Sequence, residues 1–496
     1  MRYLLLLLPL ILAGFAGSAT AARPDGQLEM TIVDEATNQP VVARMSLRNP
    51  RGRAVMERGL GVAPLGDHFY VDGRAVLAFR RGQYRFQLDS GPEYHTRQGH
   101  FEILRRSDDS TEVRMRRAAN LRKEGWLGAD LDAPRKTHGL ATAMRGEQLE
   151  HTARVGWRRG KKTWALVDKQ AGRNPLGPVG AAWDSDQGQL RFYHPRQPLT
   201  PKSLNSIDTL TADSLNQLRE QGWRIVAADL TDWRLPLWLA GDSLDAVMLI
   251  DRASLATREP REETGPPRDR DFFPGVGGVG RWREAIYFHA LSAGLHLPPV
   301  AGSGSGDNPL PLGSARVYSF TAGAPTDGDA SSAQWWDAVE AGATFVTTGP
   351  LLRPLVEGYP PGHVFDIAEG SSISFQMALN LTTREPIEYL ELIQNGEVAA
   401  NIALRKVAAN GGRLPPLTFD GPGWFTVRAV VRSDGIYRRA ISAPYYVTQG
   451  GGSRISKRSC QFFLDWIELP GYDASEEEIA TAKAFWTQQL EKAKAP

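Results

Sequence analysis

The pattern of hydrophobic residues changes twice along this chain of 496 residues, and the change limits the folds that are open to it. From about residue 25 to 118, apolar and polar residues alternate in short runs between turn-rich segments, which predicts strands. From about 121, apolar runs alternate with stretches of helical spacing, which predicts α/β structure with largely parallel strands. From about 356 to 450 the strand pattern returns. The chain is too long for one hydrophobic core, so we expect about three domains.

These patterns predict a multidomain α/β plus β protein. The opening segment 33–52, VDEATNQPVVARMSLRNPRG, resembles the transthyretin-like modules of the carboxypeptidase-regulatory type, which implies a small β-sandwich. The predicted units are a signal peptide at 1–22, an N-terminal β-sandwich at 23–119, an α/β unit at 120–355, a C-terminal β-sandwich at 356–450, and a linker with a terminal helix at 451–496.

The N-terminus has the features of a secretory signal peptide. Arg2 is followed by an apolar run from Leu4 to Leu12 and by small residues up to Ala22, where we expect cleavage. The run is shorter than the roughly 20 residues of a spanning helix, and no later stretch is long enough either. The single cysteine, Cys460, can form no disulfide within the chain. We therefore expect a soluble protein that is secreted or periplasmic.

Charge gives no general reason to expect a nucleic acid or an anionic membrane as a partner. The formal net charge is +2. A local basic excess runs from 116 to 162, and we interpret it as a solvated face rather than a site for an acidic ligand.

The middle of the chain carries clear strand and helix signals. Apolar runs at 163–168, 223–230 and 244–251 predict strands, whereas 211–223 and 280–294 have helical spacing. In folds with parallel strands, functional residues lie at the carboxyl ends of the strands. We therefore look for chemistry at those ends.

Other signals lie nearer the C-terminus. Asn395-Gly396 between two alternating runs predicts a β-hairpin. Segment 447–458 is interpreted as a flexible connector, and 475–495 as a helix whose acidic first turn and basic last turn suit the helix dipole. The run GVGGVG at 275–280 has the glycine spacing of a dinucleotide-binding loop, but no strand precedes it. We interpret it as a flexible loop that leads into a helix.

Acidic residues follow the apolar positions of GWLGADLDAPRKTHG at 125–139. On a strand, residues two apart point to the same side, so Asp130, Asp132 and residue 134 share a face. Carboxylates on one face suit hard ions such as magnesium or manganese. Residue 134 is a proline, however, and two carboxylates alone make a weak site because a catalytic zinc needs about three protein ligands.

The chain resembles the CehA/McbA-type metallohydrolases of the PHP (polymerase and histidinol phosphatase) superfamily. The stretches 125–139, 229–250, 278–320, 335–352 and 387–399 carry the likeness, which covers about residues 120–450. GLHLPPVAGSGSG at 294–306 is its most specific part. The resemblance implies a distorted PHP-like β/α barrel at 120–355. It also implies divalent metals at the carboxyl ends of the strands, where metal-bound hydroxide attacks an ester, carbamate or phosphoester.

The metal-binding motifs of that family are largely replaced in this chain. The resemblance places the aspartate of the first motif at Asp130 and its two histidines at Asp132 and Pro134. It places the aspartate and histidine of a later motif at Gly304 and Gly306. Proline and glycine side chains offer no ligand atoms to a metal. Two other histidines are weak candidates: His194 could match a histidine at a middle strand end, and His138 could reach Asp132.

Two hypotheses follow. The first is a catalytically degenerate relative that acts as a binding or scaffolding protein and needs no cofactor, with a cleft lined by Asp130, Asp132, His194, Asp251 and Ser303. Its ligand would be a small molecule, a polyol, a glycan or a peptide. The second is an active hydrolase in which magnesium, manganese or zinc is held by Asp130, Asp132 and His194, with Asp229 or Asp251 as a further ligand. A structural envelope protein without a ligand is a variant of the first hypothesis.

Overall fold

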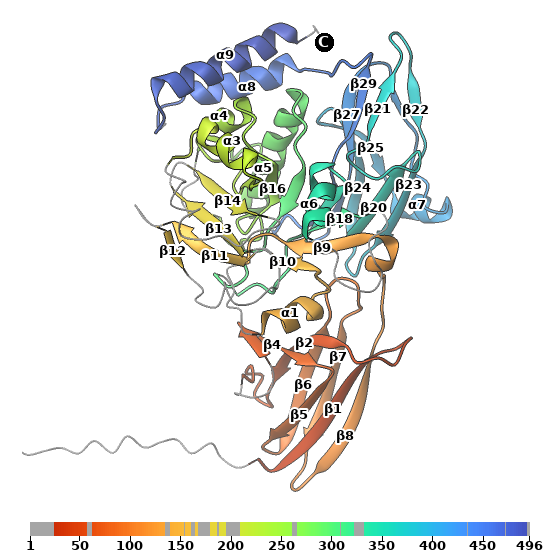
Figure 1. The fold of residues 1–496 in the computed structure, drawn as a ribbon. Coiled ribbons are helices and arrows are strands. Elements are labelled where there is room, and N and C mark those ends of the chain that lie inside the picture. The colour runs from red at the N-terminus through yellow and green to blue at the C-terminus, as the bar shows by residue number, and fades with distance from the viewer. Residues whose placement is uncertain are drawn as a thin grey trace, which may run out of the picture.

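The computed structural model describes residues 24–56, 62–133, 139–152, 154–159, 164–166, 179–185, 188–194, 209–259, 265–307, 309–321, 332–433, 435–471 and 473–493. Within these ranges the protein is a mixed α/β structure with many strands in several sheets (Figure 1). No helix in these ranges is long and apolar enough to cross a membrane. The signal peptide predicted at 1–22 lies outside them.

The N-terminal part contains two sheets around one core. β5, β1 and β8 form one sheet, in which β1 is parallel to β8, and β3, β4, β2, β6 and β7 form the other. Apolar side chains from both sheets, including Met30, Met45 and Leu77, are fully buried between them. The strands are β1 (Gly26–Asp34), β2 (Val42–Arg48), β3 (Val62–Leu65), β4 (His68–Asp72), β5 (Arg74–Phe79), β6 (Gly82–Asp89), β7 (Arg97–Ile103) and β8 (Asp108–Met115).

A seven-stranded sheet of order β12-β11-β13-β14-β15-β16-β17 lies in the middle of the described chain. β15, β16 and β17 are parallel to one another, as are β11 and β13, but β12 and β14 are antiparallel to their neighbours. The expectation of largely parallel strands is therefore only partly correct, because β13 and β14 follow each other too closely for a crossover. The strands are β11 (Arg154–Arg159), β12 (Trp164–Leu166), β13 (Val179–Asp184), β14 (Gln189–Tyr193), β15 (Arg224–Ala227), β16 (Ala246–Ile250) and β17 (Pro299–Ala301).

A ten-stranded sheet joins the middle of the chain to its C-terminal part. Its main path is β10-β9-β18-β19-β28-β27-β24-β25, and β29 pairs with both β27 and β21. The sheet is thus continuous across the boundary predicted at 355. Its strands are β9 (Trp126–Asp130), β10 (His151–Thr152), β18 (Arg316–Phe320), β19 (Thr344–Thr347), β21 (Val364–Ile367), β24 (Ile387–Gln394), β25 (Glu397–Ile402), β27 (Gly423–Val431), β28 (Arg439–Ser442) and β29 (Tyr445–Gln449).

Two small sheets complete the C-terminal β region. In one, β20 pairs with β23, and in the other, β22 pairs with β26. The hairpin predicted at Asn395-Gly396 is confirmed. Both residues have positive φ, and they connect β24 to β25 with Gln394 opposite Glu397. The four small-sheet strands are β20 (Leu351–Val356), β22 (Ile373–Phe375), β23 (Met377–Thr382) and β26 (Leu417–Phe419).

The predicted helices are present, with one important correction. Thr211 caps α3 by accepting from the backbone N–H of Ser214, as its position before an apolar helix suggests. GVGGVG is helical and not a loop: it forms the first turns of α5. Its glycines allow close packing, because a Cβ on Gly278 would lie 2.0 Å from the carbonyl oxygen of Phe273. The helices are α1 (Leu140–Gly146), α3 (Ala212–Glu220), α4 (Leu235–Ala240), α5 (Gly275–Ser292), α6 (Ser332–Glu340) and α7 (Leu404–Ala409), with the short 3-10 helix η1 (Arg122–Glu124).

The C-terminal segment packs on the core of the middle part. The expected terminal helix is α9 (Glu476–Lys492), which begins with a capping box between Ser475 and Glu478. A helix that the sequence analysis missed, α8 (Lys457–Glu468), precedes it, so the predicted connector at 447–458 is partly strand and partly helix. Trp486 is fully buried, and its indole N–H donates to the carbonyl of Pro236 at 3.0 Å. Figure 1 shows the α8–α9 pair at the end opposite the N-terminal sheets.

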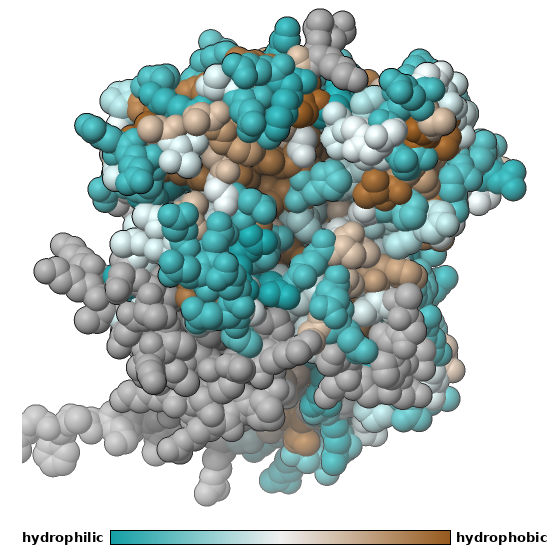
Figure 2. Space-filling view, turned by 45° about the horizontal axis from the view of Figure 1, so that its top comes forward, coloured by the Kyte–Doolittle hydropathy of each residue, from teal (hydrophilic) through white to brown (hydrophobic). Residues whose placement is uncertain are grey.

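The surface is mixed in character. Figure 2 shows apolar areas between hydrophilic ones on the face nearest the viewer. The basic stretch at 116–162 is not simply a solvated face, because several of its arginines pair with carboxylates. Arg117 lies 3.4 Å from Asp34, and Arg158 lies 2.7 Å from Asp307.

Candidate functional site

Acidic residues gather at one end of the two large sheets. Asp130 ends β9, Asp184 ends β13, and Asp229 and Asp251 follow the last residues of β15 and β16 closely. β15 and β16 run parallel, so their carboxyl ends lie at the same edge of the sheet. The connection between the two sheets lies nearby, where the N–H of Leu131 donates to the carbonyl of Ala301. Asp130, Asp184, Asp229 and Asp251 thus lie at or just beyond the carboxyl ends of their strands.

Asp130 is fully buried and accepts several hydrogen bonds. The backbone N–H groups of Asp132, Ser303 and Gly313 donate to its carboxylate at 3.2, 3.0 and 2.7 Å. The hydroxyl of Ser303 also donates to it. Burial raises the pKa of Asp130 to about 6 in spite of these donors. Asp130 therefore connects the loop after β17, through Ser303, to the end of β9.

Asp132 is paired with a buried arginine. Arg191, on β14, is 1% exposed, and its Nε lies 3.1 Å from Oδ1 of Asp132. The same guanidinium group lies 2.6 Å from Oδ1 of Asp184. These two carboxylates hold the pKa of Arg191 above its ordinary range, although burial alone would lower it. Arg191 therefore supplies a positive charge between two of the gathered acids.

A second buried arginine joins Asp229 to Asp251. Arg283, on α5, has Nη2 2.8 Å from Oδ2 of Asp229 and Nε 3.3 Å from Oδ2 of Asp251. The remaining carboxylate oxygens accept from nearby loop residues, Thr231 for Asp229 and Ser254 for Asp251. Both oxygens of each carboxylate thus interact with donor groups of the protein itself.

Asp232, which the sequence pattern did not mark, lies close enough to Arg191 and Arg283 for both charges to act on its pKa. It is fully buried, its Oδ2 accepts from the N–H of Gln189 at 2.6 Å, and its Oδ1 has no hydrogen-bond partner among the described residues. Burial and the neighbouring Asp229 raise its pKa well above the ordinary value, while Arg283 and Arg191 act in the opposite direction. The Asp232 carboxyl group therefore holds its proton more tightly than an exposed aspartic acid does.

His194 does not join this cluster, so its inclusion in the predicted site is wrong. It follows the last residue of β14, and β14 runs antiparallel to β15, so His194 lies at the opposite edge of the sheet from Asp229. Its Nε2 lies 3.3 Å from the carbonyl oxygen of Gln221, and its ring meets Trp223 edge-on. The antiparallel direction of β14, which the sequence pattern did not reveal, is the reason.

The described side chains fit a divalent metal ion poorly. No group of three or more His, Cys, Asp or Glu side chains in the described ranges is placed to hold one ion. Gly304 lies next to Asp132, because its N–H donates to the carbonyl of Asp132 at 2.7 Å, but Gly304 offers no side-chain ligand. Gly306 likewise has none, and Pro134 and His138 lie outside the described residues. The neighbouring carboxylates already pair with Arg191 and Arg283.

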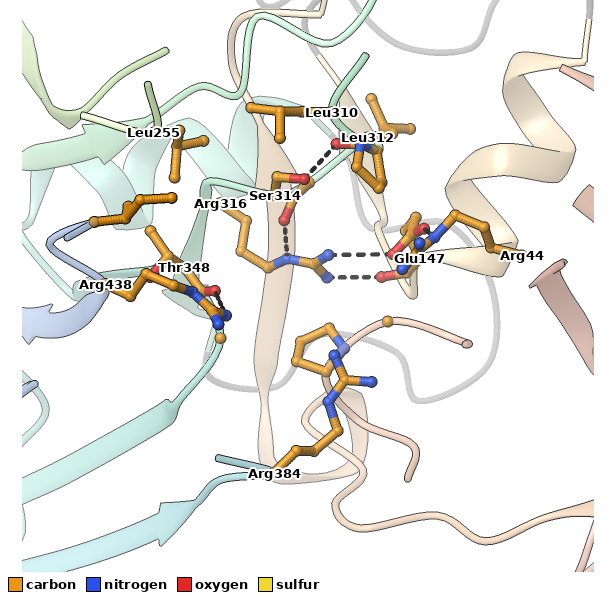
Figure 3. Close-up of a pocket in the computed structure, with 16 residues that line it drawn as sticks. Arg44, Glu147, Leu255, Leu310, Leu312, Ser314, Arg316, Thr348, Arg384 and Arg438 are labelled. Atoms are coloured by element: carbon orange, nitrogen blue, oxygen red, sulfur yellow. Dashed lines mark hydrogen bonds and ion pairs between the residues drawn. The ribbon is translucent and has the colours of Figure 1, made fainter. Parts of the chain in front are cut away.

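A pocket of about 240 Å³ adjoins the buried cluster (Figure 3). Its wall includes Gly313, whose N–H donates to Asp130. Four arginines from distant parts of the chain also line it: Arg44 from β2, Arg316 from β18, Arg384 between β23 and β24, and Arg438 between β27 and β28. We call this cavity the arginine pocket. It lies between the N-terminal sheets, which contribute Arg44, and the segment directly after β19, which contributes Thr348.

The sequence also did not predict which carboxylates pair with these arginines. Arg44 lies 2.8 Å from Glu147, and Arg316 lies 3.5 Å from the same carboxylate. Glu147 is 2% exposed and also accepts from the hydroxyl of Tyr70 at 2.9 Å. Each of the two arginines is more than 100 positions from Glu147 in the sequence, so no local pattern predicts these ion pairs. Arg191 did leave a signal, because a charged residue interrupts the apolar strand LRFY at 190–193.

Comparisons with family models, with curated proteins and with solved structures gave no match.

Proposed function

We propose that this chain is an exported binding or scaffolding protein built on a PHP-like frame that no longer carries out metal-dependent hydrolysis. The proposal combines the resemblance to CehA/McbA-type hydrolases with the pairing of the gathered carboxylates. The observation that carries it is the position of Arg191 and Arg283, each of which lies between two of the acids at the strand ends.

The arrangement of strands is compatible with such a frame. The carboxyl ends of β9, β15, β16 and β17 lie close together, as the strand ends of a β/α barrel would. Leu131 and Asp132 form hydrogen bonds with the last residue of β17 and with Gly304 in the loop that follows, and these bonds connect the two large sheets. On the same frame, the two sheets at 24–118 would form a β-sandwich.

Electrostatics supports loss of the metal. Buried carboxylates require a compensating positive charge, because an unpaired charge costs several kcal/mol in the interior. A metal ion would supply that charge in an active hydrolase. Here guanidinium groups supply it: Arg191 for Asp132 and Asp184, and Arg283 for Asp229 and Asp251. A divalent ion at the same place would meet like charges.

A hydrolysis assay tests the proposal. Mature protein would be incubated with Mg²⁺, Mn²⁺ or Zn²⁺ and with an aryl ester, an aryl carbamate or a phosphodiester. We expect no turnover above that of the Asp132→Ala variant. Metal-dependent turnover that Asp132→Ala abolishes would overturn the proposal and favour the active hydrolase with an atypical ligand set.

A further inference from the structure

The arginine pocket carries more positive than negative charge. Four arginines line it, whereas the carboxylates that pair with them are Glu147, Asp89 and Glu385. Glu147 is shared by Arg44 and Arg316. Each of the other two carboxylates is the partner of an arginine that is partly open to solvent. The balance therefore favours an anion over a cation.

Two of the arginines retain N–H groups that the protein does not use. Arg384 makes its hydrogen bonds to Asp89, Tyr94 and Thr96 through Nη1 alone, so its Nε and Nη2 donate to no described residue. Arg438 donates through Nη1 to Glu385 and through Nη2 to Thr348, and its Nε has no described acceptor. Their side chains are 26% and 29% exposed. Figure 3 shows them extending toward the pocket from different sides.

Apolar side chains form another part of the wall. Leu255, Leu310, Leu312 and Ile436 line the pocket together with the arginines. The volume of about 240 Å³ lies below the usual range for drug-sized ligands, so the occupant must be small. Guanidinium groups match the planar oxygens of carboxylates and the oxygens of phosphates.

We propose that the arginine pocket binds a small organic anion, whose carboxylate or phosphate group contacts Arg384 and Arg438 and whose apolar part contacts Leu255 and Ile436. This proposal deepens the proposed function and rests on it, since it names the ligand class of a binding protein. The pocket lies beside Asp130 but uses none of the paired carboxylates that argue against a metal.

Calorimetric titration with benzoate and with phenyl phosphate tests the proposal, with benzamide as the neutral analogue. We expect saturable binding of at least one anion that weakens as salt concentration rises, and no binding of benzamide. The two anions distinguish a carboxylate site from a phosphate site. Arg384→Met and Arg438→Met should each weaken binding roughly ten-fold or more, because each removes a charged hydrogen-bond donor.

Both variants should fold. Asp89 keeps hydrogen bonds from Gln87 and Thr96 at 2.9 and 2.6 Å without Arg384, and Glu385 is 35% exposed and stays hydrated without Arg438. Unchanged melting temperatures without ligand would verify this, and Arg384→Lys would keep the charge if Arg384→Met unfolds. The exposed Arg405 on α7 provides a matched control, and Arg405→Met should leave affinity unchanged.

The proposal is overturned if neither anion binds saturably, if benzamide binds equally well, or if affinity is the same in both pocket variants and in Arg405→Met. Such a result leaves the proposed function standing, because the hydrolysis assay reports on Asp132 and not on the pocket. Conversely, metal-dependent turnover would refute the proposed function even if the anions bind.

Discussion

Nη2 of Arg283 lies 2.8 Å from Oδ2 of Asp229, and both side chains are 7% exposed. The pair connects α5 to the end of β15. Such a pair adds little net stability compared with apolar residues of the same shape, but loss of one partner leaves a buried charge without compensation.

Replacement of Arg283 should therefore be costly. Arg283→Met leaves Asp229 and Asp251 without their shared cation, and we expect a loss of about 3–5 kcal/mol in the free energy of unfolding, measured by urea denaturation. Arg281→Met, at an exposed position on the same helix, is the control and should cost no more than about 1 kcal/mol, because it removes only the contact of Arg281 with the ring of Tyr437. Addition of Asp229→Asn to Arg283→Met should recover part of the loss. Equal stability of Arg283→Met and Arg281→Met would contradict this account.

Removal of Arg191 should create affinity for a cation. Arg191→Ala leaves space between Asp132 and Asp184, whose carboxylates lie 3.1 and 2.6 Å from the guanidinium group in the native protein. We expect the variant to melt at a lower temperature, and Mn²⁺ to recover part of the difference because binding to the folded state stabilises it. Mn²⁺ should not change the melting temperature of the native protein or of Arg405→Ala. If Mn²⁺ does not change the melting temperature of Arg191→Ala, the guanidinium group of Arg191 does not occupy the place of a metal ion.

Glu93 should make stability depend on pH. Burial raises its pKa from 4.5 to about 7, so the folded state binds its proton more tightly than the unfolded state does. The stability that this proton contributes is present below the unfolded pKa and is lost as pH rises through the folded pKa. Glu93→Gln should therefore gain stability relative to the native protein between pH 4.5 and 7, by on the order of 3 kcal/mol at most.

Urea denaturation at a series of pH values measures this difference. The exposed Glu102→Gln, also in the N-terminal sheets, is the control and should follow the native profile. Parallel profiles for Glu93→Gln and the native protein would show that Glu93 does not titrate in this range.

The glycine run at the start of α5 gives a test of packing. Alanine is the better helix former by about 1 kcal/mol, yet a Cβ on Gly278 would lie 2.0 Å from the carbonyl oxygen of Phe273. We expect Gly278→Ala to lower the melting temperature, at a cost of about 1–3 kcal/mol. Gly421→Ala, where a Cβ meets no atom within 4 Å, should be nearly neutral. A stabilised Gly278→Ala would mean that propensity outweighs the contact.

Local patterns predicted much of the secondary structure but little of the site. Alternation and turn residues predicted the hairpin at Asn395-Gly396. Helical spacing predicted a helix at 211–223, and the charges of its first and last turns predicted one at 475–495, because these signals depend on neighbours in sequence. The pattern predicts a loop at GVGGVG because helix propensity does not account for the close packing around Gly278 that requires glycine. α8 was missed because it follows a glycine-rich stretch.

The arginines that pair with the acidic residues could not be predicted, because they are distant from them in the sequence. Asp130, Asp132, Asp229 and Asp251 could be placed at strand ends, since each follows an apolar run. The pairing of the last three with Arg191 and Arg283 depends on contacts across 30 to 60 positions of the sequence. His194 was misplaced because the direction of β14 is set by its short connection to β13, which hydrophobic alternation does not report.

Metal content per chain tests the central claim most directly. The mature protein would be purified without chelators, equilibrated with Mn²⁺, Mg²⁺ and Zn²⁺ in turn, freed of excess ions and measured by mass spectrometry beside Asp132→Ala. The account predicts that the native protein retains no stoichiometric metal and does not differ from the variant. One ion held per native chain and lost in Asp132→Ala would contradict it.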